Sequence, residues 1–251
     1  MSLIATIKVE LREQVNPARA ANAPRFFKAG PGEYAEGDKF IGISVPDTRV
    51  VAKKYRDLQL SEVSKLLHST WHEERLTAIF ILVSQFERGT EATRRKCYNL
   101  YLTNTKYVNN WDLVDSSASR IVGAFLVDKP ERLVVLEKLA HSDLLWERRI
   151  AMISTLYYIV ILGRADEAIV VAEILLHDKH DLIQKAVGWM LREVGKRVDH
   201  SLLCEFLDRH AATMPRTTLR YALEHFTPEK RQYYMSKKAI METGRRNDQT
   251  N

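Results

Sequence analysis

The hydrophobic positions of the chain follow a helical pattern over most of its length. From Pro46 onward, apolar residues recur at the i, i+3, i+4 spacing of amphipathic helices. The clearest segments are EVSKLLH, ERLTAIFILVSQF, RLVVLEKLA, RRIAMISTLYYIVI and IQKAVGWMLREVGK. Strand patterns that alternate with helices are absent from the sequence, which argues against an α/β nucleotide-binding fold. The pattern therefore predicts an all-α protein.

Short polar breaks separate these segments at a constant period. One residue at the same place in each break, which we call the anchor of its repeat, marks the spacing. Successive anchors lie 36, 37, 36 and 36 residues apart. The anchors are His68, Asn104, His141, His177 and Thr213. A constant period with two helices per unit is typical of an α-solenoid of HEAT-like helical repeats, in which stacked pairs form an extended concave surface.

We expect a single HEAT-like repeat domain that spans residues 1–251. Within it, residues 1–45 contain N-terminal helices and a loop, residues 46–242 contain the helical repeats, and residues 243–251 form a polar tail. The loop includes the glycine-rich stretch GPGEYAEGDKFIGISVP. The histidines that recur at the anchors are expected to close helix C-termini.

Composition and charge indicate the class of partner and the cellular compartment that we expect for the chain. It has 251 residues, with 38 Lys and Arg against 32 Asp and Glu, a net charge of +6 and a pI of about 9.2. This positive excess favours a polyanionic partner such as nucleic acid. No stretch approaches the roughly 18–20 apolar residues of a membrane span, and the N-terminus lacks the layout of a secretory signal. Two cysteines, Cys97 and Cys204, predict no disulfide framework, so we expect a reducing, cytoplasmic setting without a membrane.

Several motif classes are missing from the sequence. It contains no GxxxxGKS or GxxxxGKT phosphate loop, no GxSxG elbow and no HExxH zinc site. Its cysteines and histidines do not have zinc-ligand spacing. We therefore expect neither a metal nor a cofactor.

The repeat also predicts which side chains share a surface. Residues 7, 8, 11 and 12 positions beyond an anchor fall within an arc of roughly 140° on the second helix of the repeat. These positions hold Arg75, Trp111, Asp115, Arg148, Arg149, Lys185, Trp189 and Arg220. Cations neutralise phosphates and aromatic rings pack against sugars or bases, so we predict a concave basic groove that binds nucleic acid. The ordinary alternatives are a core role, which we favour for Trp71 and Trp146, and pairing of Asp115 with Arg120.

Five segments of the sequence form a specific combination of motifs. They are FIGISVPDTR (40–49), WDLVD (111–115), WERRIA (146–151), DLIQKAVGWMLREVGK (181–196) and MPRTTLRYALEHF (214–226). Together they resemble the diagnostic segments of AlkD-type DNA alkylation repair proteins, and the resemblance runs from about Phe26 to Phe226. It implies a curved stack of HEAT-like repeats. The residues 30–39 depart from it, because this loop is longer and richer in glycine than in the type member.

The resemblance also implies an activity and a set of catalytic residues. The family's two tryptophans, aspartate and arginine match Trp111, Trp189, Asp115 and Arg149. The implied function is a DNA glycosylase of base-excision repair that removes cationic alkylated purines, 3-methyladenine and 7-methylguanine, without a base-flipping pocket. Its partner would be alkylated double-stranded DNA, bound by a monomer. Further contacts to the DNA backbone are expected from Arg75, Arg148, Lys185 and Arg220.

Two other functions compete with this interpretation. The first is a non-catalytic HEAT-repeat protein that binds branched or distorted DNA, since relatives of that kind tend to have lost members of the catalytic set. Retention of all four residues favours the enzyme. The second is a protein–protein scaffold, which predicts an apolar or acidic groove and not a basic one.

Overall fold

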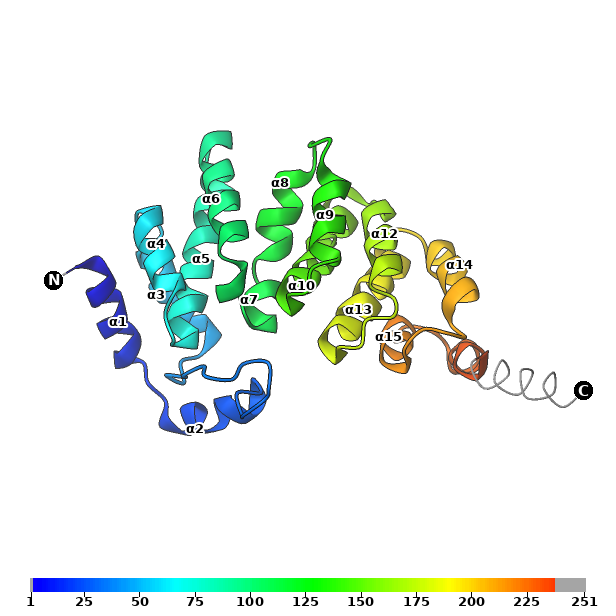
Figure 1. The fold of residues 1–251 in the computed structure, drawn as a ribbon, viewed down its shortest axis with the longest axis horizontal. Helices are drawn as coiled ribbons and strands as arrows, with labels where there is room; N and C mark the ends of the chain where they lie inside the picture. The colour runs from blue at the N-terminus through cyan, green and yellow to red at the C-terminus, as the bar shows by residue number, and fades with distance from the viewer. Residues whose placement is uncertain (1, 238–251) are drawn as a thin grey trace, which may run out of the picture. The chain divides into compact units, whose positions relative to one another are not determined.

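The computed structural model describes residues 2–237, and the predicted polar tail, 243–251, lies outside them. The described chain is helical, and its only strand-like pairing is an isolated bridge between Lys39 and Trp71. It divides into two compact units, residues 1–125 and 126–251 (Figure 1). Whether the two units act as one domain stays a prediction.

The first unit is built around one long helix, α5. Its helices are α1 (Leu3–Glu13), α2 (Pro17–Phe26), α3 (Val45–Lys54), α4 (Leu60–Leu67), α5 (His72–Arg88), α6 (Glu91–Thr103) and α7 (Trp111–Asp115), with a 3-10 turn η1 (Thr105–Tyr107) and a π-helix η2 (Ser119–Gly123). Helix α5 packs against α3, α4 and α6. Acidic residues in its first turn and Arg88 in its last turn complement the helix dipole. Its apolar side chains, among them Ile79 and Leu82, are fully buried and form the core of this unit.

The second unit has α13 at its centre. A short α8 (Ala124–Leu126) spans the boundary between the units in the sequence, and the helices of the second unit include α9 (Arg132–Ala140), α10 (Leu145–Ser154), α11 (Leu156–Leu162), α12 (Asp166–Ile174), α13 (Asp181–Arg197), α14 (His200–His210) and α15 (Arg216–Ala222). Helix α13 packs against α10, α14 and α15. Gly188 permits the close approach of α15, because a Cβ there would lie 2.5 Å from the Thr218 carbonyl oxygen.

The anchors of the sequence repeat fall where helices end. His68, Asn104 and His141 are the C-cap residues of α4, α6 and α9. His177 and Thr213 lie three residues beyond the ends of α12 and α14. Within the first unit, the side chains of two successive anchors meet, with His68 Nε2 at 2.6 Å from Asn104 Oδ1. The predicted all-α helical-repeat fold is confirmed, as is the placement of histidines at helix C-termini for His68 and His141.

No helix within residues 2–237 combines the length and the apolar character needed to cross a membrane.

The contact at Gly188 predicts the effect of a single methyl group. Alanine favours a helix over glycine by roughly 1 kcal/mol, but the added Cβ must displace the backbone of α15. We expect Gly188→Ala to lower the free energy of unfolding by about 1–2 kcal/mol in urea denaturation. Lys196→Ala, at an exposed position of the same helix, is the matched control and should stay within about 0.5 kcal/mol. A Gly188→Ala variant as stable as the wild type would show that α13 and α15 do not pack this closely.

Candidate functional site

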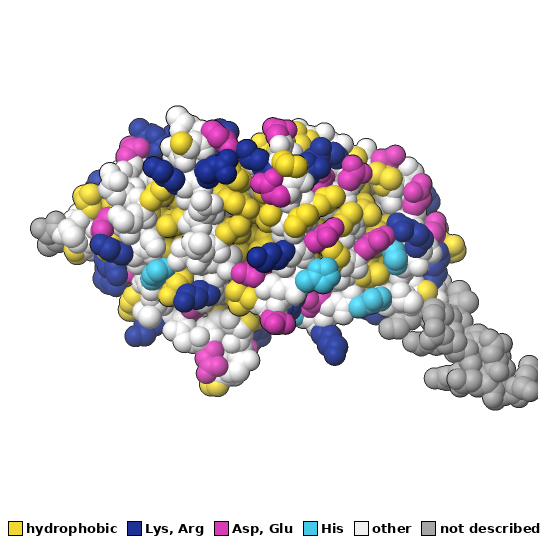
Figure 2. Space-filling view, turned by 45° about the horizontal axis from the view of Figure 1, so that its top comes forward, with side chains coloured by type: hydrophobic (Ala, Val, Ile, Leu, Met, Phe, Trp, Pro, Cys, Tyr) yellow, Lys and Arg dark blue, Asp and Glu magenta, His cyan; other side chains and the backbone are white. Residues whose placement is uncertain are grey.

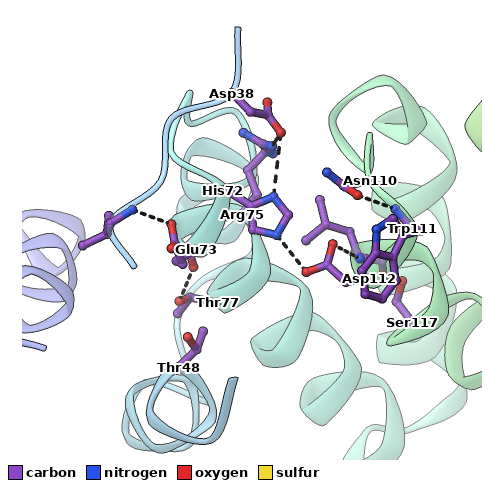
Figure 3. Close-up of polar contacts among 12 residues, drawn as sticks. Asp38, Thr48, His72, Glu73, Arg75, Thr77, Asn110, Trp111, Asp112 and Ser117 are labelled. Carbon is purple, nitrogen blue, oxygen red and sulfur yellow. Dashed lines mark hydrogen bonds and ion pairs between the residues drawn. The ribbon is translucent and has the colours of Figure 1, made fainter. Parts of the chain in front are cut away.

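Four consecutive polar side chains at the start of α5 are buried. His72, Glu73, Glu74 and Arg75 have exposed fractions of 2%, 5%, 0% and 2%. Burial of a polar or charged group costs free energy unless the group is paired. Each of the four has a partner outside α5. Figure 3 shows the partners of His72, Glu73 and Arg75. We call these four residues the α5 quartet.

Glu73 holds the loop that joins α2 to α3. Its carboxylate accepts hydrogen bonds from the backbone N–H groups of Ile41, at 2.9 Å, and of Gly42, at 2.7 Å. Gly42 has a φ of +86°, and a Cβ there would collide with the Asn16 carbonyl oxygen at the start of α2. Only glycine fits this turn. The FIGIS segment is thus a structural turn that joins α2 and the loop to α5.

Glu74 holds the first helix. Its carboxylate accepts hydrogen bonds or ion pairs from Lys8 Nζ at 2.9 Å, Arg12 Nη1 at 2.9 Å and Ser69 Oγ at 2.6 Å. Burial alone would raise the pKa of Glu74, but these three donors outweigh it and lower the pKa below its ordinary value. The Arg12 guanidinium also lies over the ring of Trp71, 5.4 Å from its centroid.

Arg75 is engaged within the protein. Its Nη2 donates to Asp38 Oδ2 at 2.6 Å, and its Nη1 donates to the Ser69 carbonyl oxygen at 2.9 Å. The offset from the anchor predicts this side chain at the surface of the groove, whereas it lies under the α2–α3 loop with 2% of its surface exposed. An arginine in this position supports the loop and offers no free guanidinium to a ligand.

His72 lies between two carboxylates from different parts of the first unit. Its Nε2 is 2.8 Å from Asp112 Oδ2 in α7, and its Nδ1 is 3.7 Å from Asp38 Oδ2 in the loop. Burial and the charge of Arg75 lower the pKa of His72, but the two carboxylates outweigh both and raise it to about 9. His72 is therefore an imidazolium at neutral pH.

Aromatic rings surround Trp111, the first residue of α7. The ring of Phe27 stacks on it, with centroids 5.7 Å apart and an interplanar angle of 28°, and Phe26 meets it edge-on at 5.7 Å. Phe27 also lies 4.6 Å from the imidazole of His72 and stacks on Phe40. Trp111 is half-buried, while Phe26 beside it is 64% exposed. The ring of Trp111 is thus positioned by residues from the N-terminal part of the chain.

Asp115 lies one helical turn after Trp111, as the last residue of α7, and is half-buried. Nearby, the buried Tyr101 hydroxyl is hydrogen bonded to Ser117 Oγ at 2.9 Å. Burial raises the pKa of Tyr101, and the negative charge of Asp115 raises it further. Arg120, considered above as a partner of Asp115, donates two hydrogen bonds to Glu87, at 2.7 and 2.8 Å.

A short stretch, residues 116–118, separates α7 from the π-helix η2. Such π-bulges are rare and occur frequently at functional sites.

The second unit contains the other residues predicted for catalysis. Arg149 of α10 is 5% exposed, and its Nη1 donates to the Leu182 carbonyl oxygen in the first turn of α13 at 2.5 Å. Trp189 is half-buried in the middle of α13, next to Gly188. The buried arginine therefore links α10 to the helix that carries Trp189.

The other predicted DNA-binding cations of the second unit differ in their exposure and in their ion pairs within the protein. Arg148 donates to Asp178 Oδ2 at 2.7 Å and to two carbonyl oxygens of the α9–α10 turn, at 3.0 and 2.9 Å. Lys185 pairs with Asp181 one turn earlier in α13, at 2.7 Å, and Arg220 is exposed on α15. On the face drawn in Figure 2, Lys and Arg side chains are interspersed with Asp and Glu side chains. Ion pairs thus take up part of the positive charge.

The sequence prediction named some of these residues and not others. It named Trp111 and Asp115, which the structure places on α7, and Arg149 and Trp189, which lie on α10 and α13 of the second unit. It missed the residues that hold α7, namely Asp38, His72 and Asp112. A signal was available for two of them, because His72 and Asp112 lie 4 and 8 positions beyond their anchors, within the same arc of the helix surface.

Among residues 2–237, we find no group of three or more His, Cys, Asp or Glu side chains that could hold a metal ion.

Comparison with known proteins identifies relatives of the chain. The family model described as DNA alkylation repair enzyme matches residues 7–226. Among solved structures, the chain is similar to a predicted DNA alkylation repair enzyme from Enterococcus faecalis, with 18% identity and a TM-score of 0.65. The match covers 86% of this chain and 98% of that one, and at this identity it shows the fold. A search of curated proteins finds no significant match.

The imidazolium of His72 predicts a pH-dependent contribution to stability. Its pKa of about 9 lies above the ordinary value of 6.5, so the contribution is fully present below pH 6.5 and is lost as the pH rises through 9. A shift of this size corresponds to roughly 3 kcal/mol. We expect the difference in free energy of unfolding between wild type and His72→Gln, measured in urea, to shrink by about this amount between pH 6 and pH 10.

The variant His68→Gln is the control for this prediction. It alters a histidine of the same unit that lies at the end of α4 and takes no part in the α5 quartet. A His72→Gln difference that stays constant from pH 6 to pH 10 would mean that His72 is neutral in the folded protein.

Proposed function

Because the chain belongs to the DNA alkylation repair enzyme family, we propose that it is a DNA glycosylase that excises cationic alkylated purines. The substrates are 3-methyladenine and 7-methylguanine in double-stranded DNA, and the protein acts on them as a monomer. One observation carries the proposal: the half-buried carboxylate of Asp115 lies one helical turn from Trp111, whose ring is fixed by Phe27. A carboxylate beside a fixed aromatic ring suits a reaction that develops positive charge on a sugar.

The reaction follows from the charge of the substrate. Alkylation at N3 of adenine or N7 of guanine makes the base cationic, so that it leaves without being protonated. The bond between the anomeric carbon and the base nitrogen breaks, and its electron pair neutralises the departing base. The sugar becomes oxocarbenium-like, and water then adds to the anomeric carbon and loses a proton. In this proposal Asp115 stabilises the sugar cation and orients the water that attacks it.

The aromatic residues would contact the sugar and not the base. Trp111 would pack on the deoxyribose at the lesion, where the face of its ring also favours the developing positive charge. We propose that Trp189 of α13 likewise packs on the sugar–phosphate backbone of the DNA. The lesion then remains in the base stack, and no base-flipping pocket is needed. This predicts tolerance of bulky cationic adducts.

The cations take different roles according to their burial. Arg149 is buried and bonded to the Leu182 carbonyl oxygen, which favours a role in orienting the start of α13 over a direct contact with a phosphate. Arg148 and Arg75 are similarly engaged with Asp178 and Asp38. Lys185 and Arg220 are more exposed, and we propose that they contact the DNA backbone.

Removal of the Asp115 charge tests the proposed chemistry. We expect Asp115→Asn to slow the release of 7-methylguanine and 3-methyladenine from methylated duplex DNA by at least 100-fold, roughly the effect of losing one preorganised electrostatic group. Affinity for the duplex should change less than threefold. The matched control is Asp128→Asn, which alters an exposed carboxylate and should release both bases at the wild-type rate.

Two results would overturn the glycosylase. One is rapid excision of a neutral base such as uracil or hypoxanthine, because a neutral base needs a proton donor that this mechanism does not contain. The other is wild-type protein that binds DNA tightly but releases no methylated base, which would favour the non-catalytic DNA-binding function.

The salt dependence of DNA binding tests the backbone contacts. Each phosphate neutralised by a cation contributes about −0.9 to the slope of log K against log salt. We therefore expect Lys185→Gln and Arg220→Gln each to reduce the magnitude of that slope by about 1, measured by fluorescence anisotropy between 50 and 200 mM salt. Lys138→Gln, exposed in the last turn of α9, is the control. Unchanged slopes for both variants would remove these residues from the interface.

A further inference from the structure

The α5 quartet contains one residue whose position links it to the proposed reaction. We infer that His72 is a positioning residue, which joins the α2–α3 loop to α7 and so fixes the orientation in which Trp111 meets DNA. The link to catalysis rests on the proposed function, whereas the effect on Trp111 does not.

The first connection runs through Asp112. One carboxylate oxygen of Asp112 faces His72 Nε2 at 2.8 Å, and the other accepts the backbone N–H of Leu113 at 2.9 Å. The same carboxylate therefore binds the first turn of α7 and the start of α5. Helix α7 has only five residues, so it depends on such contacts for its position.

The second connection runs through an aromatic ring. The ring of Phe27 contacts both the imidazole of His72, with centroids 4.6 Å apart, and the indole of Trp111, with centroids 5.7 Å apart. A movement of His72 would therefore change the position of Phe27 and, through their ring contact, the position of Trp111. His72 thus acts on the backbone of α7 through Asp112 and on the Trp111 ring through Phe27.

The charges around His72 explain why a histidine suits this place. Four charged groups meet here: His72 and Arg75 of α5, Asp38 of the loop and Asp112 of α7. Both ring nitrogens of His72 face carboxylate oxygens, and only an imidazolium carries a proton on each nitrogen. With His72 charged, two cations balance two anions. With His72 neutral, one buried negative charge is left uncompensated, which weakens the junction between the loop and α7.

The fluorine NMR spectrum of the full chain labelled with 5-fluorotryptophan tests this inference without any need for activity. The Trp111 resonance is assigned from its loss in Trp111→Phe. In the wild type we expect this resonance to shift between pH 6 and pH 10 with a midpoint near 9. In His72→Gln it should lie at a different position throughout and no longer titrate with that midpoint. The Trp146 and Trp189 resonances of the second unit should not change.

Two further variants make the test specific. His68→Gln should give the wild-type Trp111 resonance, since it alters a histidine outside the network. Asp112→Asn keeps an acceptor for the Leu113 N–H but removes the charge, so it should reproduce the effect of His72→Gln and replaces that variant if it does not fold. A Trp111 resonance that is unchanged in folded His72→Gln or Asp112→Asn protein would overturn the inference.

The kinetic readout connects His72 to the proposed reaction. We expect His72→Gln to lower the single-turnover rate of 7-methylguanine release about tenfold, with less than a twofold change in affinity for the duplex, because misplacement of a reacting group costs rate more than binding. His72→Gln combined with Asp112→Asn should lose no more than either alone. If no variant, the wild type included, releases a base, the proposed function fails while the NMR result still decides the role of His72. A normal rate in His72→Gln beside a shifted Trp111 resonance would refute the link to catalysis.

Discussion

The first unit depends on the burial of four consecutive polar residues at the start of α5. These residues are an imidazolium, two carboxylates and a guanidinium. Burial of each charged group without a partner would cost several kcal/mol of folding free energy, so four neighbouring groups can be buried only if all of them are paired. Their partners come from α1, the α2–α3 loop and α7. The N-terminal segment, α1 to the α2–α3 loop, is therefore an integral part of the first unit. Its charged side chains balance the buried charges at the start of α5, the first long helix.

This constraint has a consequence for the proposed site. Helix α7 is too short to define its own position, yet it carries both Trp111 and Asp115. Its start is fixed by the Asn110 side chain, which accepts the Trp111 N–H at 2.8 Å, and by the contact between Asp112 and His72. Beyond its end, Ser117 is hydrogen bonded to the buried Tyr101. Groups that stabilise a transition state act well only when they are already in place, and these contacts supply that order.

The repeat pattern in the sequence predicted most of the fold, but it did not predict which side chains are buried. The constant period located the ends of α4, α6 and α9 at the anchors, because the same packing recurs in each helix pair. Counting from the anchors gave the direction of a side chain around its helix but not its distance from the surface. Arg75 and Arg149 therefore lie in the predicted arc and yet are buried. The contact between His72 and Asp112 spans 40 residues, and the path of the α2–α3 loop over both follows from no repeat.

The proposed role of Asp115 is tested most directly by measuring whether the protein binds DNA with a positively charged sugar analogue more tightly than DNA with a neutral one. Two matched duplexes would be compared by fluorescence anisotropy, one with a cationic pyrrolidine in place of a deoxyribose and one with neutral tetrahydrofuran. If Asp115 stabilises the oxocarbenium-like sugar, the wild type binds the cationic duplex at least about tenfold more tightly, which corresponds to roughly 1.4 kcal/mol, and Asp115→Asn binds both alike. Equal affinity of the wild type for the two duplexes, or a preference that survives in Asp115→Asn, would contradict that role.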